Sequence, residues 1–165
     1  MEPWLTGTLN HLSPIAAALL YSFEQARDDL RRWTEGLSEE QIWRRTGEVA
    51  SVGFHIRHIA GSVDRLITYA DGRQLDESQL NALRSEQNDG GLSRDQLLTM
   101  LDEQLRKTEE IVRAIDSGSL VAIREIGRKR TPVPLGVLLV HISEHTQRHV
   151  GAAIVTCKVV RSLPL

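Results

Sequence analysis

The sequence predicts an all-α protein, folded as a four-helix bundle with one long crossover connection. Four long segments are rich in helix-forming residues and carry apolar side chains at helical spacing, at 8–34, 52–71, 94–116 and 134–160. A long polar connector separates the second and third segments. Long amphipathic helices of this kind bury their apolar faces against one another, and no repeating period indicates an elongated helical array instead.

The first predicted helix, at 8–34, is rich in Ala, Leu, Glu, Gln and Arg, and its charged final turns are typical of a solvated face. Gly36 follows, and a glycine just beyond a helix commonly ends it in the left-handed conformation. The sequence Ser-Glu-Glu-Gln at 38–41 is a capping-box pattern. It predicts a short helix of about two turns before the second long one.

The second long helix is expected at 52–71, because Asp71 and Gly72 supply a stop signal. The polar connector QLDESQLNALRSEQNDGG follows, partly helical and closed by a pair of glycines. Ser93 then stands where it would cap the third long helix, at 94–116. The connector is therefore the long crossover of the predicted bundle.

Residues 119–134, SLVAIREIGRKRTPVP, alternate in polarity and include two prolines. This pattern predicts an extended crossing segment containing a short strand or hairpin. Pro134 stands near the first turn of the last helix, where the missing N–H of proline is tolerated. That helix is expected to continue to about residue 160.

Composition restricts the class of protein. The chain has 165 residues, of which 41% are hydrophobic and 25% charged, with a net charge of −2, so it lacks the positive field that nucleic-acid binding requires. A single cysteine, Cys157, excludes an internal disulfide framework and fits a reducing cytosol. The N-terminal region resembles no signal peptide, and its longest apolar run, 15–21, is too short to span a bilayer. We expect one soluble, cytoplasmic domain over 1–165, with no nucleic-acid or membrane partner.

Three of the six histidines lie in the last predicted helix, four residues apart: His141, His145 and His149. On a helical wheel, His145 and His149 fall within an apolar stripe formed by Leu135, Leu138, Ile142, Ala152 and Ala153. A buried polar group without a partner costs ~1–3 kcal/mol. Two imidazoles on successive turns of a buried face therefore indicate a site rather than ordinary packing.

Metal binding is the function that this spacing favours. Histidines at positions i and i+4 lie about 6 Å apart on one helix face, and their rings can converge on one ion. A third ligand must come from another helix, and the second long helix offers His55 and His58. Periodicity places His55 nearer the centre of the apolar face of this helix. His58 lies on a flank of that face, and in a bundle the flanks also face neighbouring helices. The pattern alone leaves both residues open.

Two segments carry a resemblance to a known family: SVGFHIRHIAGSVDRLITYADG at 51–72 and LLVHISEHTQRHVG at 138–151. They resemble the signature segments of the DinB/YfiT-like superfamily of small bacterial four-helix-bundle proteins. The resemblance extends over most of the chain, including GLSEEQIWRR and REIGRKR. It implies a metal-ligating triad of His58, His145 and His149, usually holding zinc or nickel. Relatives often carry glutamine where this chain has Ala152, so a polar contact near the site is absent.

The resemblance also implies a class of reaction. Characterised relatives are transferases and isomerases that use a low-molecular-weight thiol, so a metal-dependent thiol S-transferase or related detoxifying enzyme is expected. It would act on a small-molecule substrate as a homodimer. His141 and His55 are candidates for catalytic or supporting roles. Arg124 and Arg128, the latter beginning a basic run, are candidates for attracting an anionic thiol cofactor, with a solvated linker as the ordinary alternative.

Other functions remain open at the level of sequence. The same ion could activate water in a metal-dependent hydrolase. In a non-catalytic protein the metal could stabilise the bundle by joining its helices, with His141 or His55 as the fourth ligand. A helical interaction module would bind no metal between its helices, and it would expose a large apolar patch. We interpret Cys157 as a packing residue and His11 as a surface or packing residue, while the metal itself is not specified by imidazole ligands.

Overall fold

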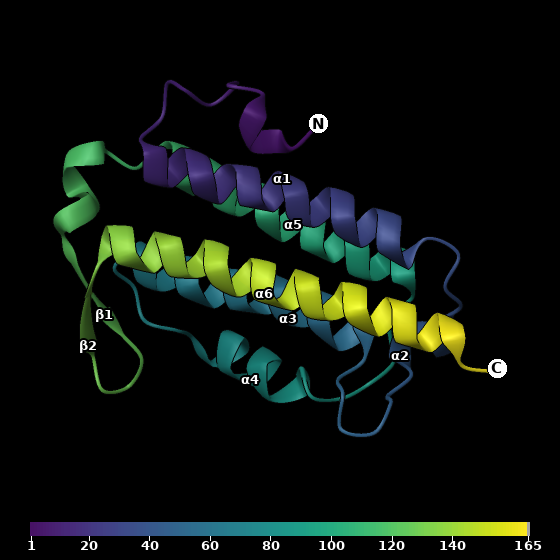
Figure 1. Ribbon diagram of the computed structural model, residues 1–165. Coiled ribbons are helices and arrows are strands. Elements are labelled where there is room, and N and C mark those ends of the chain that lie inside the picture. Colours follow the sequence, from purple (N-terminus) through teal and green to yellow (C-terminus); the bar gives the residue numbers. More distant parts are fainter. Residues whose placement is uncertain (165) are drawn as a thin grey trace.

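The computed structural model describes residues 1–164, and its four long helices form a bundle (Figure 1). They are α1 (Pro14–Thr34), α3 (Val52–Ala70), α5 (Arg94–Arg113) and α6 (Leu135–Ser162). Both α1 and α3 pack against α5 and α6, so the four helices form a closed ring. As Figure 1 shows, α1 and α6 run in one direction and α3 and α5 in the other. The predicted fold class is confirmed.

Shorter elements connect and cover the bundle. They are two 3₁₀ helices, two short α-helices and one antiparallel hairpin: η1 (Pro3–Leu5), α2 (Glu39–Trp43), α4 (Glu77–Ser85), η2 (Ser117–Val121), β1 (Ile123–Ile126) and β2 (Thr131–Pro134). The hairpin pairs Ile123 with Pro134 and Ile126 with Thr131, which confirms the extended segment before the last helix. Across the described residues, every helix is too short or too polar to cross a lipid bilayer.

Local capping residues set where the helices begin. The prediction that the first helix starts near residue 8 is wrong: Ser13 caps it through the N–H of Ala16, and Pro14 occupies its first turn. Ser38 and Ser93 form the capping boxes that start α2 and α5. α5 ends at Arg113, earlier than expected, because the N–H groups of residues 114 and 115 bond carbonyls three residues back and tighten the final turn.

The core is apolar and is shared by all four long helices. Phe23, Ile56, Leu101 and Leu139 are fully buried, one from each helix. On α6 the buried face is shifted around the helix from the stripe predicted from the sequence, and it follows Leu139, Ile142, Thr146, Val150, Ala153 and Cys157. The two histidines predicted for the middle of that stripe instead lie half-buried at its edge. The difference arises because α6 packs against both α1 and α3, which turns another row of side chains inward.

The long connection between α3 and α5 is confirmed, and it contains α4. We call residues 71–92 the crossover segment. Its one buried side chain is Glu86, which is 4% exposed. Arg57 of α3 donates hydrogen bonds to the carbonyl oxygens of Asn88 and Gly90. The crossover segment is therefore attached to the bundle by polar contacts and by the partly buried Leu75 and Leu92, rather than by a fully buried apolar face.

Candidate metal centre

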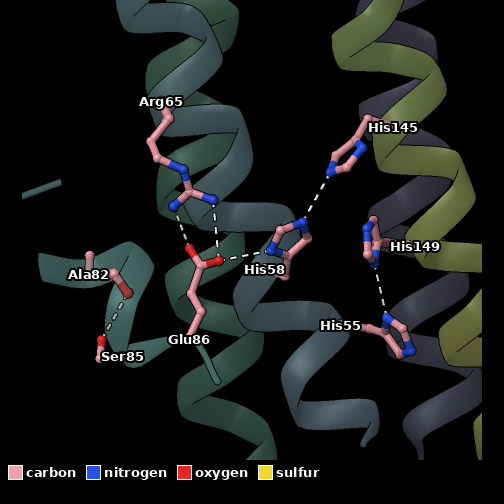
Figure 2. Close-up of polar contacts among 8 residues, drawn as sticks. All are labelled: His55, His58, Arg65, Ala82, Ser85, Glu86, His145 and His149. Atoms are coloured by element: carbon pink, nitrogen blue, oxygen red, sulfur yellow. Dashed lines mark hydrogen bonds and ion pairs between the residues drawn. The ribbon is translucent and has the colours of Figure 1, made fainter. Parts of the chain in front are cut away.

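Three histidines meet in the seam between α3 and α6 (Figure 2). His58 comes from α3, and His145 and His149 come from successive turns of α6. One possible ligand atom from each ring lies within 4.8 Å of the other two. Nε2 of His58 lies 3.1 Å from Nε2 of His145. The structure thus brings together the three residues that the sequence predicts as metal ligands.

The spacing of these nitrogens suits one small cation. Zinc binds imidazole nitrogen at 2.0–2.1 Å, so two nitrogens on a tetrahedral ion lie about 3.3 Å apart. The 3.1 Å separation of His58 and His145 is close to this value. The other ligand atoms of the group lie up to 4.8 Å apart, so holding one ion would require the side chains to rotate toward one another. Three imidazoles leave at least one coordination position for another molecule, and the donor set suits zinc, nickel, copper and iron.

The outer nitrogen of His58 is bound to a buried carboxylate. Its Nδ1 lies 2.8 Å from Oε2 of Glu86, and the Arg65 guanidinium contacts both oxygens of the same carboxylate. Burial by itself raises the pKa of Glu86, but hydrogen bonds from His58 and Arg65 outweigh it and hold that pKa below its usual value. Glu86 is therefore ionised near neutral pH, and Nδ1 of His58 is the donor.

His55 supports His149 from the other side. It is 7% exposed, and its Nδ1 lies 3.0 Å from Nδ1 of His149. Burial, together with the charge that His58 would carry, lowers the pKa of both His55 and His149 to about 4. Burial, and then His58, also lowers the pKa of His145. These imidazoles are neutral at pH 7, which is the form that binds a metal.

His141 lies outside the three-histidine group. Its side chain is exposed, and its Nδ1 lies 3.2 Å from Oε2 of Glu144, which also pairs with Arg148. Its ring centroid is 5.6 Å from that of His145. His141 is therefore next to the site on its solvent side, whereas His55 is next to the site within the protein.

The candidate cofactor-binding arginines lie elsewhere. Arg124 donates from Nε to the carbonyl oxygen of Ala70, 2.6 Å away, at the end of α3. Ala70 is more than three turns beyond His58, about 18 Å along the helix. Arg128 is exposed in the turn between β1 and β2. The structure does not bring either arginine to the histidines.

Cys157 is fully buried in α6, and burial raises the pKa of its thiol to about 11. A thiol with that pKa is protonated at neutral pH and is a poor nucleophile. His11 is exposed in the N-terminal segment, before α1. Neither residue belongs to the group of histidines.

Sequence reasoning missed Glu86 and Arg65. Arg65 had a weak signal, because it follows His58 by two helical turns and so shares its side of α3. Glu86 had none. It lies 28 positions from His58, beyond α4, and no periodicity connects the two residues.

Comparisons with known proteins agree with this fold. The sequence model of the DinB superfamily matches residues 22–153. A crystal structure of a protein from Streptococcus pneumoniae superposes with a TM-score of 0.65 and 13% sequence identity, covering 89% of this chain and 90% of that chain, which shows a shared fold. No curated protein matches the sequence. The family match spans most of the chain and includes all three histidines, and the protein therefore belongs to the DinB superfamily.

Proposed function

We propose that this protein binds a divalent metal ion, zinc or nickel, through His58, His145 and His149. We propose further that it uses the ion as a thiol-dependent S-transferase or a related detoxifying enzyme. The observation that carries the metal site is the meeting of three imidazoles from two helices within 4.8 Å. The reaction class draws its support from membership of the DinB superfamily and from the sequence resemblance described above.

The chain's own residues fit a site of this kind. When bound, the ion would supply a Lewis acid that lowers the pKa of a thiol or water molecule at its open position. The depressed pKa values of His55 and His149 keep their rings neutral without an ion. The exposed His141, hydrogen-bonded to Glu144, is placed to exchange a proton between the site and solvent.

A reactive centre is favoured over a purely structural one. A structural zinc site normally has four protein ligands, whereas a catalytic site keeps a position open. The two residues available to close this site, His55 and His141, lie outside the group of three whose ligand atoms are within 4.8 Å of one another. Within residues 1–164, the group that could hold an ion consists of three histidines.

Elemental analysis of protein purified without a histidine tag tests the metal site. We expect stoichiometric zinc or nickel in the wild type and its loss in His145→Ala, His149→Ala and His58→Ala. His11→Ala is the matched control, because His11 is exposed in the N-terminal segment. A metal-free wild type, or a His145→Ala variant that keeps its metal, would contradict the proposal.

Product analysis tests the reaction class. Metal-loaded protein is incubated with an electrophile such as 1-chloro-2,4-dinitrobenzene, with and without a low-molecular-weight thiol. The proposed transferase forms a thioether only when both the thiol and the metal are present. Turnover that requires metal but no thiol would indicate hydrolysis instead, by the same ion acting on water.

A further inference from the structure

The crossover segment makes one buried contact with the bundle, and that contact reaches the candidate metal centre. Glu86 is its single buried side chain, and α4 itself buries no residue. The carboxylate lies between Arg65 and His58, both on α3, and contacts each of them (Figure 2). The attachment of this segment and the orientation of a predicted ligand therefore depend on the same group.

The backbone of α3 leaves room for this carboxylate at Gly61. A Cβ atom at that position would clash with Oε1 of Glu86 and lie 2.8 Å from Nη1 of Arg65. A glycine within a helix weakens it relative to alanine, so its presence here needs a reason. The reason visible in the structure is the close approach of Glu86 and Arg65 to the helix backbone.

The hydrogen bonds among Arg65, Glu86 and His58 determine which nitrogen of His58 carries the proton. Arg65 only donates hydrogen bonds, and an ionised carboxylate only accepts them. With Arg65 on both oxygens, Glu86 accepts a further hydrogen bond from His58, so the proton of His58 stays on Nδ1. The lone pair of its Nε2 is then directed toward Nε2 of His145, 3.1 Å away.

We propose that Glu86 is a positioning residue for the metal centre: it holds the His58 proton on Nδ1, presents Nε2 to the ion and joins the crossover segment to the site. This inference rests on the proposed metal binding. Carboxylates that orient metal-ligating histidines typically contribute 10- to 100-fold in metal affinity. A role limited to holding the segment down would leave the tautomer of His58 and the metal affinity unchanged.

The first measurement uses metal-free protein. Long-range ¹⁵N–¹H NMR of the imidazole rings reports which nitrogen of His58 carries the proton. We expect Nδ1 in the wild type and a shift of the proton toward Nε2 in Glu86→Gln. Glu77→Gln is the matched control, since Glu77 belongs to the same segment but is exposed, and it leaves the tautomer unchanged.

The second measurement is zinc affinity, by competition with a chromogenic chelator. We expect binding about 10- to 100-fold weaker in Glu86→Gln and in Gly61→Ala, and wild-type binding in Glu77→Gln. Gly61→Ala keeps every charged group and favours the helix, so it guards against a Glu86 variant that fails to fold. Hydrogen exchange adds a third readout: zinc slows exchange of amides at 77–90 in the wild type but not in Gly61→Ala.

The outcomes separate the two proposals. If the wild type binds zinc, and both Glu86→Gln and Gly61→Ala bind zinc with the same affinity as the wild type, this inference alone is overturned. A proton found on Nε2 of His58 in the metal-free wild type does the same. A wild type that takes up no zinc or nickel overturns the proposed function, and with it the role of Glu86 in metal binding.

Discussion

Nδ1 of His55 lies 3.0 Å from Nδ1 of His149, although the two residues are 94 positions apart in the chain. One of the two nitrogens must donate and the other accept, so each ring fixes the orientation of the other. The contact leaves Nε2 of His149 free to face the other histidines. Two of the three candidate ligands, His58 and His149, are thus held at their outer nitrogen by a buried partner.

Removing His55 should weaken metal binding without abolishing it. We expect His55→Ala to lower zinc affinity about tenfold, because His149 loses the group that orients it. His55→Asn should retain more affinity, since its amide places a hydrogen-bonding atom close to the position of Nδ1. Isothermal titration with zinc chloride measures the difference, and equal affinities in the two variants and the wild type would contradict it.

Metal should stabilise the fold. An ion at about 100 times its dissociation constant adds about 2.7 kcal/mol to the free energy of unfolding. For a chain of this size, that raises Tm by about 5–10 °C. Thermal unfolding followed by circular dichroism should show this rise, and chelation should reverse it. His145→Ala should show no rise and His11→Ala the full one; a rise in His145→Ala would mean that the ion binds elsewhere.

The metal-free protein should lose stability in mild acid. His55 and His149 have a pKa of about 4 when folded, because of burial and then of the charge that a protonated His58 would carry, against 6.5 when unfolded. Between these values the unfolded chain binds more protons, so the free energy of unfolding falls as the pH drops from 6.5 toward 4. Stability from this source is fully present above pH 6.5.

Urea unfolding at about pH 7.5, 6 and 5 measures this dependence through the transition midpoint. The double variant His55→Asn/His149→Asn should show a shallower decrease, because it lacks the two groups that take up protons on unfolding. An equally steep decrease in that variant would assign the acid sensitivity to other residues.

Cys157 should be unreactive in the folded protein. Burial raises the pKa of its thiol to about 11, so the thiolate is scarce at neutral pH and reagents cannot reach it. Ellman's reagent should modify it slowly in buffer and rapidly in urea. Cys157→Ala should bind metal like the wild type, whereas loss of metal in that variant would give the thiol a role at the site.

The parts of the fold that sequence predicts well are those set by neighbouring residues. Ser38 and Ser93 are capping residues whose partners stand three positions later, and both helices begin where this pattern places them. The start of α1 was predicted too early, because helix-forming composition was followed instead of the cap at Ser13. α4 has its own capping box, at Asp76 and Gln79, a local signal that the prediction of a partly helical connector does not use.

The site shows a different limit. Periodicity favoured His55 over His58 as the inward residue, and His55 is indeed the more buried of the two. It is nevertheless His58 that joins the group of three, because that group lies at the edge of the core, where the seam between two helices is open. Burial and the ability to ligate are separate properties, and a helical wheel reports only the first. The contact from Glu86 depends on tertiary structure and leaves no local pattern.

The mode of attachment of the crossover segment has an evolutionary consequence. Outside Glu86 and the partly buried Leu75 and Leu92, substitutions along this stretch alter no side chain that packs against the core, so they carry little thermodynamic penalty. We expect insertions and deletions before Glu86 to be tolerated as well, because a change in the length of a surface connection costs little entropy. We therefore expect homologous chains to diverge more in the crossover segment, and in the surface beside the histidines, than in the long helices that hold the imidazole rings.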